Sequence, residues 1–221
     1  MIAVNPAEVS ADLVNFPLYV DLSTLGTNFW SAVASNGRDI RVTSGDGQTE
    51  LPHDLVSINT TAKTGELHFL ADAVDSATTT YFFVYFDNPA ASAYYPTDTY
   101  GSQAVWAEYE AVYHFSDSSV AVDSYALDAT ANERHLLIEG AALATSTGRL
   151  GQGINLIGST GILRNAGFTW TAGNPLVTSG WYKMPASSNE SLWQWGTGAS
   201  PDNLEFRPWY NTTGGLHYFG V

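Results

Sequence analysis

The chain contains no cysteine among its 221 residues. This absence excludes disulfide bonds, thiolate-bound metals and a cysteine nucleophile. Basic residues are also scarce: Lys and Arg together number 8 against 22 Asp and Glu, which gives a formal net charge of −14. Because nucleic-acid binding draws affinity from Lys and Arg that neutralise phosphates, we expect no nucleic-acid partner.

Long apolar runs and targeting patterns are missing as well. No stretch approaches the ~18 apolar residues of a membrane span, so we expect no membrane insertion. The first six residues lack the basic region and the apolar core of a signal peptide. An extracellular location would therefore require another route, such as release of a virion protein by lysis or processing of a longer precursor.

Charged residues are few, at 14% of the chain, whereas hydrophobic residues make up 44%. A typical soluble protein has about 25% charged residues, so Ser, Thr, Asn and Gly must cover much of this surface. The hydrophobic share is large enough for a sizeable core. At roughly 100–200 residues per domain, the length predicts one large domain or two small ones.

Short β-branched and aromatic stretches predict strands throughout the first part of the chain. They cover residues 16–22, 40–43, 55–58, 66–70 and 78–86. The last stretch is unbroken and fits a buried central strand. Asp46 and Gly47 predict a hairpin turn, because such turns need a positive φ. Residues 25–34 predict one short turn or helix.

Residues 91–105 are rich in Tyr, Thr, Pro and Ser and show no periodicity, which predicts a linker between domains at 1–90 and 106–221. The second domain has its own series of predicted strands. They cover residues 111–115, 136–138, 153–157, 168–170, 177–182, 191–195, 204–207 and 216–219. The predicted fold class is therefore all-β, with two β-sandwich domains.

Local motifs for metal or nucleotide chemistry are weak in this sequence. None of the histidines (53, 68, 114, 135 and 217) is paired at a zinc-ligand spacing, which favours turn and surface positions. The glycine-rich stretch 148–153 does not match a dinucleotide-binding loop and is followed by no Walker lysine. It is better interpreted as a turn between two strands.

Glu108 and Glu110 are the most suggestive carboxylate pair, because residues two apart share one face of a strand. A glycosidase needs an acid and a base or nucleophile that face each other across the scissile bond. Asp202 and Glu205 also lie close in the sequence, but the E-x-D-x-x-E pattern typical of glucanases is absent. We therefore interpret the pair as a solvated strand face and expect no enzyme activity.

Aromatic and amide side chains gather near the C-terminal end of the sequence. Sugar rings stack on flat aromatic faces, and their hydroxyls pair with Asn and Asp, so this combination suits a glycan-binding groove. The candidate glycan residues are Trp193, Trp195, Asp202, Asn203, Trp209, Tyr210 and Asn211. Trp193 and Trp195 also fit a core position, whereas Trp209 and Tyr210 follow Pro208 and fit an exposed one. Asp and Asn in loops suit Ca²⁺, which stays a candidate cofactor.

Four segments resemble a small β domain of unknown function found in bacterial, archaeal and phage surface proteins. They are 9–20 (VSADLVNFPLYV), 37–43 (GRDIRVT), 51–54 (LPHD) and 85–90 (YFDNPA). Their order and spacing match the family. The sequence departs from it at Asp54, where glutamate is usual, and at residues 86–88, where Tyr-Gly-Asn is usual.

The second half resembles a laminin-G-like, concanavalin A-like jelly roll. The matching segments are 111–117 (AVYHFSD), 148–158 (GRLGQGINLIG) and 168–183 (FTWTAGNPLVTSGWYK). The later half of that family's pattern is absent, so the predicted jelly roll is partial. Either the protein continues beyond Val221 or another chain completes the sheet, since an open sheet edge invites strand pairing.

These resemblances imply binding and surface attachment rather than catalysis. The leading hypothesis is a phage tail or capsid-surface protein, extracellular on the virion, with a lectin-like domain for host-surface glycans. The alternatives are a purely structural capsid decoration or assembly module, and a fragment of a secreted or cell-surface bacterial adhesin. The expected partners are a glycan or other virion proteins, and we expect a homo-oligomer.

Overall fold

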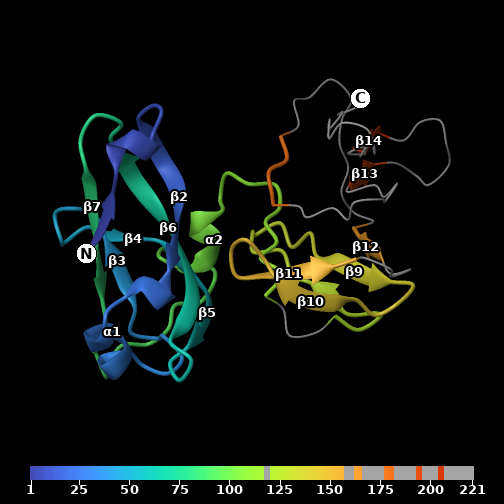
Figure 1. The fold of residues 1–221 in the computed structure, drawn as a ribbon, viewed down its shortest axis with the longest axis horizontal. Coiled ribbons are helices and arrows are strands. Elements are labelled where there is room, and N and C mark those ends of the chain that lie inside the picture. Colours follow the sequence, from blue (N-terminus) through green and yellow to red (C-terminus); the bar gives the residue numbers. More distant parts are fainter. Residues whose placement is uncertain (117–119, 157–161, 166–176, 182–192, 196–203, 207–221) are drawn as a thin grey trace, which may run out of the picture. The chain divides into compact units, whose positions relative to one another are not determined.

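The computed structural model describes residues 1–116, 120–156, 162–165, 177–181, 193–195 and 204–206 (Figure 1). It divides into two compact units, Met1–Asn174 and Pro175–Val221. The described residues are mostly β, with several antiparallel sheets and a few short helices. Among these helices, none has the length and apolar character needed to cross a bilayer.

Two antiparallel sheets make up the first part of Met1–Asn174. One has the order β1-β7-β3-β4 and the other the order β2-β6-β5. The strands of the first sheet are β1 (Ile2–Val4), β7 (Thr80–Tyr85), β3 (Arg41–Thr43) and β4 (Glu50–Leu51). Those of the second are β2 (Leu13–Asp21), β6 (Thr64–Val74) and β5 (His53–Asn59).

The buried side chains of both sheets form one shared core. Phe69 of β6 and Phe82 of β7 are fully buried, and their ring centroids lie 4.9 Å apart. Helix α1 (Thr27–Ala32) adds Phe29 and Trp30 to the same core. The short helix predicted within residues 25–34 is therefore confirmed, and its aromatic pair explains why it folds against the sheets.

Strand β7 confirms the predicted strand at residues 78–86 and lies inside its sheet, between β1 and β3. It is buried on one face only, because Tyr81 and Tyr85 are exposed while Phe82 is buried. The predicted turn at Asp46 and Gly47 is also confirmed. There the Asp46 carboxylate accepts backbone N–H bonds from Gln48 and Thr49, and Gly47 has a φ of 70°.

Small helices and sheets complete the described part of the chain. Helix α2 (Ser102–Val105) lies within the predicted linker and packs on β5 and β6, and the domain boundary at residues 91–105 stays a prediction. The remaining strands are β8 (Tyr125–Ala126), β9 (Leu136–Glu139), β10 (Ala144–Thr147), β11 (Gln152–Asn155), β12 (Ile162–Arg164), β13 (Trp193–Trp195) and β14 (Leu204–Phe206). Further 3-10 turns cover Pro6–Glu8 and Leu22–Thr24.

These later strands form a sheet of order β12-β9-β8 and the pairs β10-β11 and β13-β14. The β10-β11 pair confirms that the glycine-rich stretch 148–153 turns between two strands. A jelly roll is not identified among the residues that the structure describes.

Two predicted strands are wrong. Residues 111–115 form no strand, because their polar groups bond to scattered partners rather than to a ladder: the Val112 N–H donates to the Asp128 carboxylate at 2.9 Å, and the Tyr113 hydroxyl donates to the Arg134 carbonyl at 2.6 Å. Residues 177–181 also form no strand. Gly180 weakens that segment, since glycine is a poor strand former.

Candidate functional site

A cluster of carboxylates and histidines lies on the sheet β2-β6-β5. Glu66 and His68 share one face of β6, because residues two apart on a strand point the same way. Asp54 of the neighbouring strand β5 is directly opposite His68. The register of β5 against β6 shifts between Leu55 and Ser57, and Ser57 is the residue opposite Glu66. Such a bulge bends this edge of the sheet.

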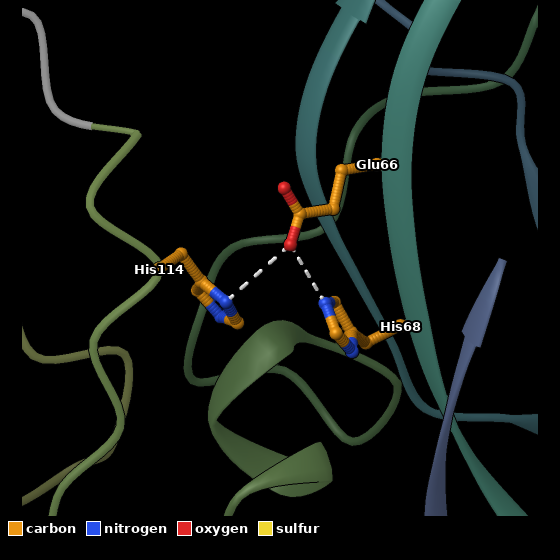
Figure 2. A group of neighbouring side chains, drawn as sticks. All are labelled: Glu66, His68 and His114. Atoms are coloured by element: carbon orange, nitrogen blue, oxygen red, sulfur yellow. Dashed lines mark hydrogen bonds and ion pairs between the residues drawn. The ribbon is translucent and has the colours of Figure 1, made fainter. Parts of the chain in front are cut away.

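His114 completes the cluster from the segment that follows α2. Its Nδ1 lies 3.8 Å from Oε1 of Glu66, and the Nε2 of His68 lies 3.0 Å from the same oxygen. Figure 2 shows both rings directed at this single carboxylate. On its other side, Nε2 of His114 lies 3.1 Å from Oδ2 of Asp54. His114 thus stands between two carboxylates from two strands.

Aromatic rings enclose the histidines. The Trp106 ring lies 5.2 Å from His68 and 5.3 Å from His114, between ring centroids, and its indole N–H donates to Oδ2 of Asp54 at 2.8 Å. The ring of Tyr19 in β2, which is opposite His68 in the strand register, lies 5.4 Å from the ring of His68. The two histidine rings are themselves 4.9 Å apart.

The cluster is buried. Glu66 is only 4% exposed, His68 8% and Asp54 9%. The second oxygen of Glu66, Oε2, is buried and has no hydrogen-bond partner. Gly151, in the turn between β10 and β11, lies against this oxygen so closely that a Cβ at this position would overlap it.

The cluster holds Asp54 in its charged form. Burial raises the pKa of this carboxyl. The hydrogen bonds from His114 and Trp106, together with electrostatic attraction from His68, outweigh burial and bring the pKa below its usual value. An ionised carboxylate accepts hydrogen bonds and donates none. The Nε2 of His114 therefore carries the proton that faces Asp54, and its Nδ1 faces Glu66.

His53 lies next to this cluster in sequence but is held in its neutral form. Burial and the positive charge of Arg41 lower the pKa of His53 to about 4, from an ordinary value of 6.5. Its Nδ1 is buried without a hydrogen-bond partner. Below pH 6.5 the unfolded chain binds a proton here that the folded chain does not, so this contribution to stability is complete above pH 6.5 and is lost as the pH falls.

As the pH falls from 7 to 5, we expect protonation of His53 in the unfolded chain to lower the free energy of unfolding by about 2 kcal/mol. Urea unfolding at both pH values measures this change. His53→Gln removes the titrating group and should show a loss that is smaller by this amount. An equal loss in the two proteins would contradict the buried, neutral state of His53.

The structure describes only two of the predicted glycan residues. Trp193 and Trp195 lie in β13, which pairs with β14. Asp202, Asn203, Trp209, Tyr210 and Asn211 lie outside the described residues. The glycan groove therefore stays a prediction, and so does the calcium ion.

The carboxylate pair Glu108 and Glu110 is exposed, as predicted, but it lies on a turn rather than on a strand. Glu110 forms an ion pair with Arg134, with 2.8 Å between the guanidinium nitrogen and the carboxylate oxygen. A surface ion pair with Arg134 therefore accounts for the position of Glu110.

Sequence reasoning missed the buried cluster. The placement of His68 at the surface or in a turn is wrong, because His68 is buried within β6. The alternation Glu66-Leu67-His68 in a predicted strand was the available signal, since it puts two chemical groups on one face. Asp54 and His114 showed no local sequence signal. Asp54 reaches this face through the pairing of β5 with β6, and His114 reaches it because the chain after α2 passes over the sheet.

No protein-family model matches the chain, and neither a curated protein nor a solved structure shows significant similarity to it.

Proposed function

We propose that this chain is a non-enzymatic, virion-associated surface protein that attaches to host-surface glycans. In this proposal, two β-sandwich domains form the protein, and the second is a partial jelly roll of the lectin type. The site of attachment is the aromatic and amide segment from Trp193 to Asn211.

The composition of that segment carries the proposal. Tryptophan and tyrosine alternate there with Asp202, Asn203 and Asn211. Flat rings stack on sugar faces, and carboxylates and amides bind sugar hydroxyls. An antiparallel pair of short strands, β13 with β14, lies within the segment and supports the proposal of a strand-based groove.

The buried cluster supports a binding protein rather than an enzyme. Glu66, His68 and Asp54 are buried, and the rings of Trp106 and Tyr19 pack against His68. A substrate would have to displace these rings to reach the carboxylates. The cluster is better suited to holding the segment around His114 on the sheet.

A pull-down on host-envelope polysaccharides and a glycan panel tests the proposed function, with Ca²⁺ in one arm and EDTA in the other. We expect saturable binding that Trp209→Ala reduces at least about tenfold, since stacked aromatic side chains dominate such contacts. Trp181→Ala is the matched control, because Trp181 is 71% exposed and lies outside the predicted groove. Its binding should equal that of the natural sequence.

A folded protein that binds no glycan in either arm would overturn the attachment function.

A purely structural module is the second candidate, and one observation favours it. Strand β2 is at the edge of its sheet and exposes Val14 and Phe16. An apolar edge strand is a ready surface for another chain. Sedimentation would then show a homo-oligomer that Val14→Lys reduces.

A further inference from the structure

We propose that Glu66, His68 and His114 bind a divalent transition-metal ion of the Zn²⁺ class, with Asp54 as the positioning residue for His114. This site involves none of the predicted glycan residues, and the proposal does not depend on glycan attachment.

The donor atoms already converge. Oε1 of Glu66 lies 3.0 Å from Nε2 of His68 and 3.8 Å from Nδ1 of His114. The three donor atoms lie within 4.8 Å of one another. A tetrahedral ion with bonds of about 2.0–2.1 Å separates its donors by about 3.3 Å. Nδ1 of His114 would have to approach Oε1 by about 0.5 Å, and the two histidine nitrogens, which lie within 4.8 Å of each other, would have to approach by up to about 1.5 Å, a movement that small side-chain rotations supply (Figure 2).

Asp54 sets the tautomer that coordination requires. A metal-bound histidine usually donates its second ring N–H to a carboxylate, which fixes the ring and leaves the other nitrogen free to bind the ion. Nε2 of His114 lies 3.1 Å from Oδ2 of Asp54 in this arrangement. The Trp106 indole N–H holds the same oxygen at 2.8 Å. The lone pair of His114 is therefore directed at Glu66.

The burial of Glu66 with too few hydrogen-bond partners is the second, independent observation. Oε2 is buried without a hydrogen bond, in a side chain that is 6% exposed. Oε2 faces the turn at Gly151 rather than the two histidines, so the ion would bind Oε1 alone and would compensate the burial of the carboxylate as a whole (Figure 2). Asp54 and Glu66 also bring two carboxylates into one buried space, and a doubly charged cation balances them.

The donor set selects the class of ion. Two imidazoles and one carboxylate suit Zn²⁺ and its neighbours in the first transition row. Ca²⁺ and Mg²⁺ instead require six or more oxygen donors in most sites. The chain has no cysteine, so the site must be built from nitrogen and oxygen. We therefore expect Zn²⁺ to bind and Ca²⁺ not to compete.

Two parts of Met1–Asn174 would be tied together by such an ion. Glu66 and His68 come from β6, whereas His114 comes from a segment without regular secondary structure. The bound ion would replace a hydrogen bond of 3.0 Å and a looser contact of 3.8 Å with two coordinate bonds. The ion would thus be structural, because rings of Trp106 and Tyr19 cover the histidines.

Zinc titration of the full chain, after EDTA treatment and buffer exchange, tests the proposal. We expect about one tightly bound Zn²⁺ per chain by competition with a chromogenic chelator, unaffected by excess Ca²⁺. Glu66→Gln and His68→Asn should each weaken binding by more than about 100-fold. Asp54→Asn should weaken it by about 10–100-fold, as expected for a positioning residue.

Glu110→Gln is the matched control for binding to surface carboxylates, since Glu110 is an exposed glutamate outside the cluster. It should bind Zn²⁺ as the natural sequence does. Circular dichroism checks that each variant is folded. Absence of stoichiometric Zn²⁺ binding, or equal affinity in Glu66→Gln, His68→Asn and Glu110→Gln, would overturn the proposal.

Imidazole NMR of the natural sequence keeps the test decisive if a variant fails to fold. Long-range ¹H–¹⁵N spectra report each histidine ring by itself. One equivalent of Zn²⁺ should change the ring signals of His68 and His114 and leave those of His53 and His135 in place. Unchanged His68 and His114 signals would show a metal-free cluster.

Discussion

Replacement of Asp54 with alanine should lower the free energy of unfolding by about 3–5 kcal/mol, the usual result of breaking a buried charged pair. Asp54 accepts hydrogen bonds from Nε2 of His114 at 3.1 Å and from the Trp106 indole at 2.8 Å. Without the carboxylate, both donors would be buried with no partner. Urea unfolding monitored by tryptophan fluorescence measures the change.

The control for Asp54→Ala is Asp72→Ala. Asp72 is exposed, on the neighbouring strand β6, and its removal should change stability by less than about 0.5 kcal/mol. Asp54→Asn keeps an acceptor oxygen and should fall between the two. Equal stability of Asp54→Ala and Asp72→Ala would contradict the network described around His114.

The second large effect concerns the shared core. Phe69→Ala should lower the free energy of unfolding by about 3–5 kcal/mol, because it removes a fully buried ring and leaves a cavity. The ring contacts Phe82 of the opposing sheet at 4.9 Å between centroids. The loss should therefore affect both sheets, and one unfolding transition should shift as a whole.

Val14→Ala is the matched control for this substitution. Val14 is 71% exposed on the edge strand β2, so its truncation should cost less than about 0.5 kcal/mol. If Phe69→Ala cost no more than Val14→Ala, the two sheets would not share a core.

Local patterns predicted most of the fold around residues 1–85. Apolar and aromatic runs predicted β2, β3, β5, β6 and β7, and the aromatic content of residues 25–34 fits the confirmed helix α1. The Asp-Gly pair predicted the turn after β3, because Gly47 adopts the positive φ that the turn needs and the Asp46 carboxylate accepts a backbone N–H bond within it. These features are local, which is why sequence alone reveals them.

Long-range bonding was not predictable in the same way. Residues 111–115 have the composition of a strand, yet Val112 and Tyr113 bond to Asp128 and to the Arg134 carbonyl. Those partners lie 16 and 21 residues away in the chain. Phe115 adopts a φ of 55°, which ends the extended backbone. Strand propensity measures none of these effects.

The candidate site depends even more on distant contacts. Glu66 and His68 share a strand face that the sequence pattern reveals, but His114 and Asp54 are 60 residues apart in the chain and adjacent in space. The bulge in β5 sets the register that places Asp54 opposite His68. The spacing of the histidines in the sequence does not reveal these contacts, so a search for local zinc motifs does not find the cluster.

The most direct test of the metal site is anomalous diffraction from crystals of the full chain grown with Zn²⁺. We predict a zinc peak about 2.0–2.2 Å from Oε1 of Glu66, Nε2 of His68 and Nδ1 of His114. Asp54 should remain bonded to His114 in that structure. A zinc-loaded crystal whose anomalous peaks lie only on exposed carboxylates, with the cluster empty and Glu66 still bonded to His68, would contradict it.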